Sequence, residues 1–273
     1  VYQIPEGLYS LRKKRKVMST EQESTDNLLP VNSPSLLMDD TTSRFSSAIW
    51  YNKIREKSIT LAGIGGIGSY VGFLLTRVKP KNIFIYDDDT VDEANMSGQL
   101  YGLEDVGEAK VGALAKMVSN YANYYSICGI SERFTADTKA SDIMICGFDN
   151  MVARKDFFLA WKNHVQSKPS EERANCLFID GRLAAEEFQV LCIKGDDEYN
   201  INRYESQFLF SDEEADETIC SYKQTTFCAN MIASYMVNLF VNFCANQCNP
   251  PIERDLPFFT TYNAEIMYLK TES

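Results

Sequence analysis

The stretch "SITLAGIGGIGSYVGFLL", residues 58–75, decides the fold. A short apolar run is interrupted by four glycines within six residues, and apolar residues then resume at helical spacing. The glycines are Gly63, Gly65, Gly66 and Gly68. Glycines let the backbone approach a phosphate closely, and the following helix supplies oriented N–H donors at its amino terminus. The stretch therefore predicts a phosphate-binding turn, which a dehydrogenase, a methyltransferase or an ATP-dependent adenylyltransferase could each use.

Strand and helix patterns alternate from this turn onward. Apolar runs predict strands at 58–63, 82–87, 142–147, 176–181, 188–195 and, near the end, within 258–270. Helical spacing predicts helices over 69–78, 105–122 and 151–164. This alternation predicts an α/β fold, namely a Rossmann-like, doubly wound, mostly parallel sheet with flanking helices.

The chain divides into two parts by composition. Residues 1–43 hold a basic cluster, "RKKRK" at 12–16, and weak periodicity, which predicts an N-terminal arm. Residues 44–273 form the predicted nucleotide-binding domain, and within it an acidic stretch at about 195–219 is expected to be irregular.

The net charge excludes two classes of binding partner, and the cysteines indicate the cellular compartment. The net charge of −11 and pI near 4.7 exclude nucleic acid and anionic membranes as primary partners, because both would be repelled. The eight cysteines show no C-x-x-C pair and no secreted-type spacing, and no signal peptide is visible. We therefore expect reduced thiols and a cytoplasmic protein.

One segment, residues 225–246, is apolar enough to resemble a membrane span. A polar residue recurs in it every four positions, at Asn230, Ser234, Asn238, Asn242 and Asn246. That stripe predicts an amphipathic helix packed on protein, with the stripe facing either water or another subunit.

The next part of the phosphate site is an acid that binds ribose. Asp87 lies 19 residues after Gly68, at the end of the second predicted strand. Up to this point a nicotinamide-dependent enzyme fits as well as an ATP-dependent one.

The segment 87–110, "DDDTVDEANMSGQLYGLEDVGEAK", resembles the ThiF/MoeB/HesA family of adenylyltransferases, which are related to ubiquitin-activating enzymes. In that family the glycine turn is followed by D-x-D, N-L-x-R-Q, G-x-x-K and D-N-x-x-x-R. The matching residues here are Asp87 and Asp89, Asn95 and Gln99, Gly107 to Lys110, and Asp149, Asn150 and Arg154. The resemblance spans roughly residues 44–248.

The resemblance implies an ATP-dependent adenylyltransferase acting on the C-terminal carboxylate of a small ubiquitin-like or sulfur-carrier protein, as a homodimer or larger assembly. A carboxylate is already ionised at neutral pH, so the reaction needs cations and alignment rather than a general base. By resemblance Lys110 holds phosphates, Asp149 holds Mg²⁺, Asn95 and Gln99 lie near the phosphates, and Asp87 binds ribose, with Asp89 and the glycines completing the nucleotide site. Taken singly, Lys110 is also compatible with a solvated helix lysine and Asp149 with a helix cap.

Two departures from the family pattern affect the triphosphate. Gly98 stands where the family has arginine, and Ser47 replaces a second arginine in "RFSSAI". Each lost charge-assisted contact typically costs about 1.5–3 kcal/mol. Arg44, Lys53 or Arg182 could compensate. If none does, the alternative function is a non-catalytic nucleotide-binding scaffold or assembly component. A third possibility is a nicotinamide-dependent oxidoreductase, which would need neither Lys110 nor Asp149.

The cysteines raise two further possibilities. Cys220 is a candidate thioester nucleophile, although the acidic stretch around it opposes thiolate formation. Cys220, Cys228, Cys244 and Cys248 could together bind zinc, but their spacing is unlike that of structural sites, so we do not expect zinc. The single histidine, His164, is expected to be structural.

Overall fold

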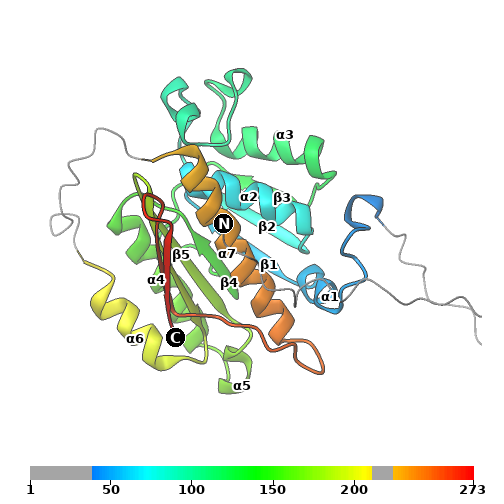
Figure 1. Ribbon diagram of the computed structural model, residues 1–273, viewed down its shortest axis with the longest axis vertical. Coiled ribbons are helices and arrows are strands. Elements are labelled where there is room, and N and C mark those ends of the chain that lie inside the picture. Colours follow the sequence, from blue (N-terminus) through cyan, green and yellow to red (C-terminus); the bar gives the residue numbers. More distant parts are fainter. Residues whose placement is uncertain (1–38, 211–223) are drawn as a thin grey trace, which may run out of the picture. The chain divides into compact units, whose positions relative to one another are not determined.

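The computed structural model describes residues 39–210 and 224–273, and these are the residues considered below. Most of the predicted N-terminal arm, part of the acidic stretch, and Cys220 lie outside the described residues. The described chain forms a single sheet with helices on both of its faces (Figure 1).

The sheet has eight strands in the order β3-β2-β1-β4-β5-β6-β7-β8. Their bounds are β1 Ser58–Ala62, β2 Asn82–Tyr86, β3 Ile127–Ile130, β4 Ile143–Cys146, β5 Leu177–Ala184, β6 Glu187–Lys194, β7 Phe259–Asn263 and β8 Tyr268–Glu272. The first five strands in sequence pair in parallel, and β6, β7 and β8 extend the sheet antiparallel. The predicted Rossmann-like, mostly parallel fold is therefore confirmed. Because the chain moves outward from β1 in both directions, a crevice is expected at the carboxyl ends of β1 and β4.

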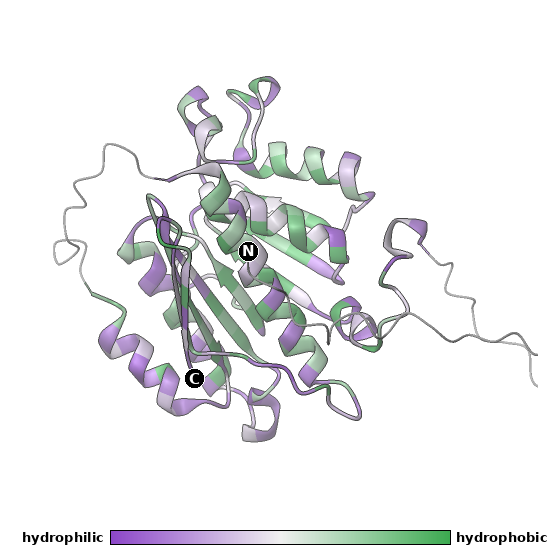
Figure 2. Ribbon diagram, viewed as in Figure 1, coloured by the Kyte–Doolittle hydropathy of each residue, from purple (hydrophilic) through white to green (hydrophobic). Residues whose placement is uncertain are grey.

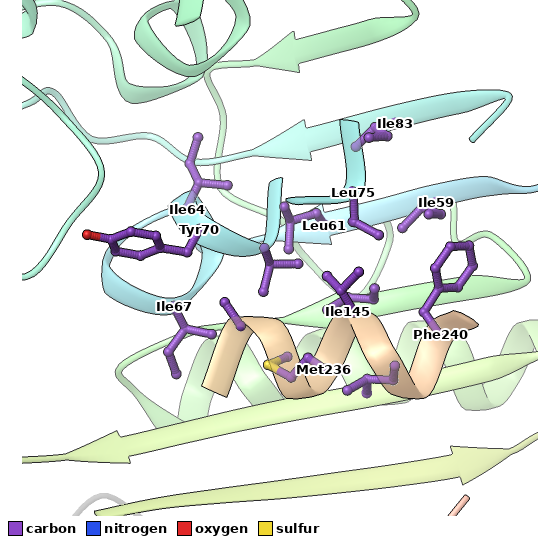
Figure 3. Packing of buried hydrophobic residues seen from close by; sticks show 14 of the residues in the cluster. Ile59, Leu61, Ile64, Ile67, Tyr70, Leu75, Ile83, Ile145, Met236 and Phe240 are labelled. Carbon is purple, nitrogen blue, oxygen red and sulfur yellow. The ribbon is translucent and has the colours of Figure 1, made fainter. Parts of the chain in front are cut away.

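Helices cover the two faces of the sheet in two apolar clusters. One face carries α1 Ile49–Arg55, α2 Gly66–Val78, α3 Lys110–Ala122 and α7 Thr226–Asn246, and the other carries α4 Met151–Gln166 and α6 Glu198–Gln207. Figure 3 shows the first cluster, where Leu61 of β1, Leu75 of α2 and Met236 of α7 meet. Short elements complete the chain, namely α5 Ser170–Arg173 and 3₁₀ turns at Asp40–Thr42, Glu93–Ser97 and Leu103–Asp105. Hydrophobic residues dominate the central strands, whereas α6 is largely hydrophilic (Figure 2).

Helix α7 is long and apolar enough to cross a membrane by length and composition, yet 56% of its apolar window is buried within the protein. It packs on α1, α2, β5 and β6, which confirms the predicted amphipathic helix packed on protein. The stripe divides: Asn230, Ser234 and Asn238 are exposed, whereas Asn242 and Asn246 donate to the backbone carbonyls of Asp255 and Arg254. The second half of the stripe therefore binds the chain's own backbone.

Several predicted boundaries were wrong. Helix α2 starts at Gly66 rather than near Ser69, so two of the four glycines belong to the helix. Helix α3 begins at Lys110, and the residues before it form a 3₁₀ turn and loop. The stretch at 195–219 contains the ten-residue helix α6, whose N-cap Asp197 accepts a hydrogen bond from Asn200 N.

The sheet itself also differs from the prediction in two places. Strand β3, which has only four residues and contains a glycine, was not predicted. The predicted terminal strand within 258–270 is two strands, β7 and β8, because the chain reverses between Asn263 and Tyr268. In both places the apolar pattern is too short to mark a strand boundary.

Candidate functional site

A cleft of about 1490 Å³ opens at the carboxyl ends of the parallel strands. It brings together nearly all of the residues predicted for the nucleotide site, although they come from five different segments. Those lining it are Gly63, Gly65, Gly66, Asp87, Asp89, Asn95, Gln99, Lys110 and Asp149. Gly68 does not line it. The crevice thus lies where the strand order reverses, as doubly wound sheets require.

The glycine turn is shaped by backbone packing. Gly63 has φ +73°, and a Cβ there would lie 2.9 Å from a ring carbon of Phe148 and 3.0 Å from its backbone nitrogen. A Cβ on Gly68 would lie 2.0 Å from the carbonyl oxygen of Gly63, so this glycine serves close helix–strand packing rather than ligand contact. No side chain in the described part of the chain caps the amino terminus of α2, which leaves its first N–H groups for an anion.

Asp87, directly after β2, holds this turn in place. One carboxylate oxygen accepts from Ile64 N at 2.8 Å and the other from Asp89 N at 3.0 Å. Burial raises the pKa of Asp87, and Lys110 opposes that effect. Asp87 therefore positions the glycine turn, and its binding of ribose remains a prediction.

Lys110 is the first residue of α3 and is almost completely buried, which is incompatible with a solvated surface lysine. Its Nζ lies 2.7 Å from Asp89 Oδ2 and 3.9 Å from Asp87 Oδ1. Two carboxylates thus hold the ammonium group at the wall of the cleft, where a phosphate could accept from it.

The two amide residues have different surroundings. Asn95 Oδ1 accepts from Asp92 N at 3.0 Å and so completes a capping box with Asp92, the N-cap of the 3₁₀ turn in which Asn95 lies. Gln99 Oε1 is buried and has no hydrogen-bond partner among the described residues. Its amide borders the glycine turn, since a Cβ on Gly65 would lie 3.7 Å from Gln99 Nε2. A buried carbonyl oxygen left without a partner costs about 1–3 kcal/mol, so Gln99 Oε1 fits a site that a polar ligand completes.

Asp149 lies in the loop after β4 and is exposed to the cleft. The cap of α4 is Asn150, whose Oδ1 accepts from Ala153 N at 2.9 Å, so Asp149 is not the helix cap. None of the described lysines or arginines forms an ion pair with Asp149. A carboxylate oxygen in this setting is the kind of ligand that Mg²⁺ prefers, so the residue present fits the predicted metal.

A charged network lies beneath the cleft. Asp180 is fully buried and forms an ion pair with Arg154. Its carboxylate also accepts hydrogen bonds from Arg182 Nε at 2.8 Å and from the Tyr204 hydroxyl at 2.9 Å. Cys146 Sγ lies 2.9 Å from the same carboxylate. Burial works to raise the pKa of Asp180, but the two guanidinium groups outweigh it and lower that pKa. Arg154, which belongs to the family signature, is almost completely buried and paired with Asp180 at a wall of the cleft, which Arg182 also lines.

The structure also locates the departures from the family pattern. A Cβ on Gly98 would lie 2.6 Å from the Gln224 amide nitrogen, so glutamine fills the space beside this glycine. Ser47 is exposed and does not line the cleft. Of the three candidate compensating cations only Arg182 lines the cleft, as Arg44 and Lys53 do not.

Sequence reasoning missed several residues of the cleft, among them Arg133 and Gln224. Arg133 lines it and lies 3.3 Å from Asp88. Gln224 also lines the cleft, although it lies more than a hundred residues after Gln99 in the sequence. Arg133 follows the short strand β3, and recognising that strand was the one signal that could have placed it.

The cysteines do not assemble the zinc set considered from sequence. Cys228 and Cys244 are 16 residues apart on α7, which corresponds to about 24 Å along a helix. Burial raises the pKa of the Cys244 thiol to about 12. Cys220, the candidate thioester nucleophile, lies outside the described residues.

Comparison with known proteins agrees with this geometry. Ubiquitin-like modifier-activating enzyme 5 of Bombyx mori is 28% identical over 160 residues, covering 53% of this chain and 39% of the relative. The Culex quinquefasciatus protein of the same name is 31% identical over 126 residues, covering 45% of this chain and 31% of the relative. The chain thus spans less than two fifths of these relatives.

Solved structures share the fold. MccB of E. coli with ATP superposes with a TM-score of 0.61 at 14% identity, covering 88% of this chain and 73% of MccB. PaaA gives a TM-score of 0.62 at 14% identity, covering 82% of this chain and 66% of PaaA. The ThiF family pattern itself matches residues 43–272. With its glycine turn, buried lysine and exposed aspartate gathered in one cleft, this chain belongs to the ThiF family.

Proposed function

We propose that this protein is an ATP-dependent adenylyltransferase that activates the C-terminal carboxylate of a small ubiquitin-like or sulfur-carrier protein. The observation that carries the proposal is Lys110, which two carboxylates hold at the wall of the cleft beside the glycine turn. Its ammonium group, the uncapped N-terminus of α2 and Arg182 offer positive potential to a triphosphate.

The reaction proceeds without a protein base. A carboxylate oxygen of the substrate attacks the α-phosphorus of ATP, the bond between that phosphorus and the bridging oxygen breaks, and pyrophosphate leaves with the electron pair. The residues bind and align the reactants, and they neutralise charge that shifts toward the leaving group. Asp149 would hold Mg²⁺, which supplies further neutralisation of the phosphates.

The relatives support the substrate class. The curated relatives are named for activating a ubiquitin-like modifier, and MccB has been crystallised with ATP and with the peptide MccA. Both descriptions name a polypeptide partner, and the MccB structure adds ATP.

A second function, a non-catalytic nucleotide-binding scaffold, is favoured by one observation. The space beside Gly98, where the family has an arginine, is filled by the neutral Gln224 side chain. Arg182 cannot fully replace that arginine, because it also binds Asp180 and donates to the carbonyl oxygen of Phe208 at 2.8 Å.

Calorimetry tests nucleotide binding first, with ATP and Mg²⁺ compared with NAD. We expect ATP binding in the wild type and its loss in Asp149→Ala. Asp156→Ala is the matched control, since Asp156 also lines the cleft but belongs to no signature. Binding of NAD in preference to ATP would contradict both functions.

Pyrophosphate exchange into ATP then separates the two functions. The assay uses small ubiquitin-like proteins ending in Gly-Gly as the carboxylate substrate. Exchange that depends on Lys110 supports the adenylyltransferase. ATP binding with no exchange for any carboxylate partner supports the scaffold.

A further inference from the structure

A second cluster of reactive side chains lies at the amino-terminal ends of β4 and β5, at the opposite edge of the sheet from the cleft. Asp142 and Cys176 directly precede Ile143 and Leu177, which are register partners in the parallel pair. Leu177 N donates to Asp142 O at 2.9 Å. The sheet itself therefore sets these two side chains next to each other.

The third member, His164, comes from α4. Trp161, one turn earlier on that helix, donates from Nε1 to Asp142 O at 3.2 Å and fixes the helix against this edge. His164 Nε2 lies 2.7 Å from Asp142 Oδ1, and Cys176 Sγ lies 3.9 Å from the same oxygen. The nitrogen, sulfur and oxygen atoms all lie within 4.8 Å of one another.

We propose that Asp142, His164 and Cys176 form a binding site for a divalent transition metal ion of the Zn²⁺ type. Bonds of about 2.0–2.3 Å in a tetrahedral site place ligand atoms roughly 3.3–3.8 Å apart, which small side-chain movements reach here. The carboxylate and imidazole side chains are 45% and 28% exposed, so an ion can enter, while the thiol is buried behind them. A fourth position faces solvent and would take water.

Coordination changes several bonds at this site. His164 binds the metal through Nε2 as a neutral imidazole with its proton on Nδ1, so its hydrogen bond to Asp142 Oδ1 is lost. The Cys176 thiol proton passes to solvent as the metal–sulfur bond forms. Lys168, whose Nζ now lies 2.9 Å from Asp142 Oδ1, gives up that ion pair. The site is independent of the proposed function, and its mixed ligands differ from the four-thiol set considered from sequence.

Titration of the full chain with Co²⁺ tests the proposal, since tetrahedral Co²⁺ bound to a thiolate has a strong charge-transfer absorption. We expect one such ion per chain, displaced by Zn²⁺. Cys176→Ser should abolish the charge-transfer band, and His164→Gln should weaken binding by at least about 100-fold. Cys128→Ser is the matched control, because Cys128 is an exposed thiol on β3, and it should bind as the wild type does.

A gain-of-binding variant keeps the test decisive even where the cysteine variant does not fold. Lys168→Met removes the competing cation and should tighten Co²⁺ binding by about fivefold. Absence of a thiolate band in the wild type, or an unchanged band in Cys176→Ser, would overturn the site. Co²⁺ held only by the carboxylates of the cleft gives no thiolate band and counts equally against it.

Discussion

Two groups of charges lie near the carboxyl ends of the parallel strands, and they differ in how completely they are neutralised. Asp180 is buried and bound by Arg154, Arg182 and Tyr204. Every oxygen of its carboxylate has a partner within the protein. Such a network is a fixed part of the framework.

The rim of the cleft is the contrasting group. Asp87, Asp88 and Asp89 lie together there, with carboxylate oxygens within 4.8 Å of one another. Only two of the described cations form ion pairs with them, the buried Lys110 and the largely exposed Arg133. The same residue types therefore form a rigid support where one acid is paired with two cations, and a ligand-responsive surface where three acids share two cations.

The largest expected effect comes from breaking the buried group. Asp180→Asn leaves Arg154 as an uncompensated buried charge, and we expect it to lower the free energy of unfolding by about 3–5 kcal/mol. Urea denaturation measures this loss. Arg154→Met/Asp180→Leu removes both charges and should lose less stability than Asp180→Asn. A loss below about 1 kcal/mol in Asp180→Asn would show that the network is not a fixed support.

The second-largest effect is expected on ATP affinity, when Lys110 at the rim of the cleft is replaced. Lys110→Met should weaken ATP binding by about 10–150-fold, because one charge-assisted contact to a phosphate is lost. Calorimetry measures the affinity, and thermal unfolding measures separately the stability lost when the buried Asp87 carboxylate loses its cation. Lys116→Met on the same helix is the control, since Lys116 pairs with Asp105 and Glu108 outside the cleft. Equal losses in the two variants would contradict a phosphate-binding role.

The pH dependence of stability should have opposite signs in the two groups. The folded pKa of Asp87 is raised above 3.8, so its favourable contribution is present below 3.8 and is lost as pH rises through the folded pKa. The pKa of Asp180 is lowered, so its contribution is present above 3.8 and is lost as pH falls through the folded pKa.

Urea midpoints of the wild type and Asp87→Asn, compared at neutral pH and at about pH 4, test the first sign. The stability of the wild type relative to the variant should increase toward the lower pH. A constant difference would show that burial does not raise the pKa of Asp87.

The smallest effect is expected at the outer rim. Arg133→Ala should change ATP affinity less than about threefold, because this exposed side chain is screened by salt and its pair with Asp88 is worth less than about 1 kcal/mol. Calorimetry at low and high salt measures the ATP affinity of this variant and of the wild type. A loss as large as that of Lys110→Met would place Arg133 among the phosphate ligands.

The nucleotide cleft was predicted from sequence to the extent that it depends on short local patterns. The turn at 63–68, the acid at the end of β2 and the lysine opening α3 each lie at the end of a regular element, where apolar periodicity stops. The parallel order of the strands then brings them to one edge of the sheet. The N-cap of α4 could not be predicted in this way. Either Asp149 or Asn150 could cap the helix, and the choice depends on backbone geometry that the two residue types do not reveal.

Everything that depends on contact between distant segments required the tertiary structure. Asp180 meets Arg154 and Tyr204, Gln224 fills the space beside Gly98, and Asp142 meets His164 and Cys176 only after the sheet and α4 have packed. The sequence alone determined the ThiF-like phosphate turn, because periodicity and backbone sterics act over a few residues. Which charges are buried, paired or left for a ligand was decided by tertiary packing, because burial and Coulomb interactions depend on distance in space.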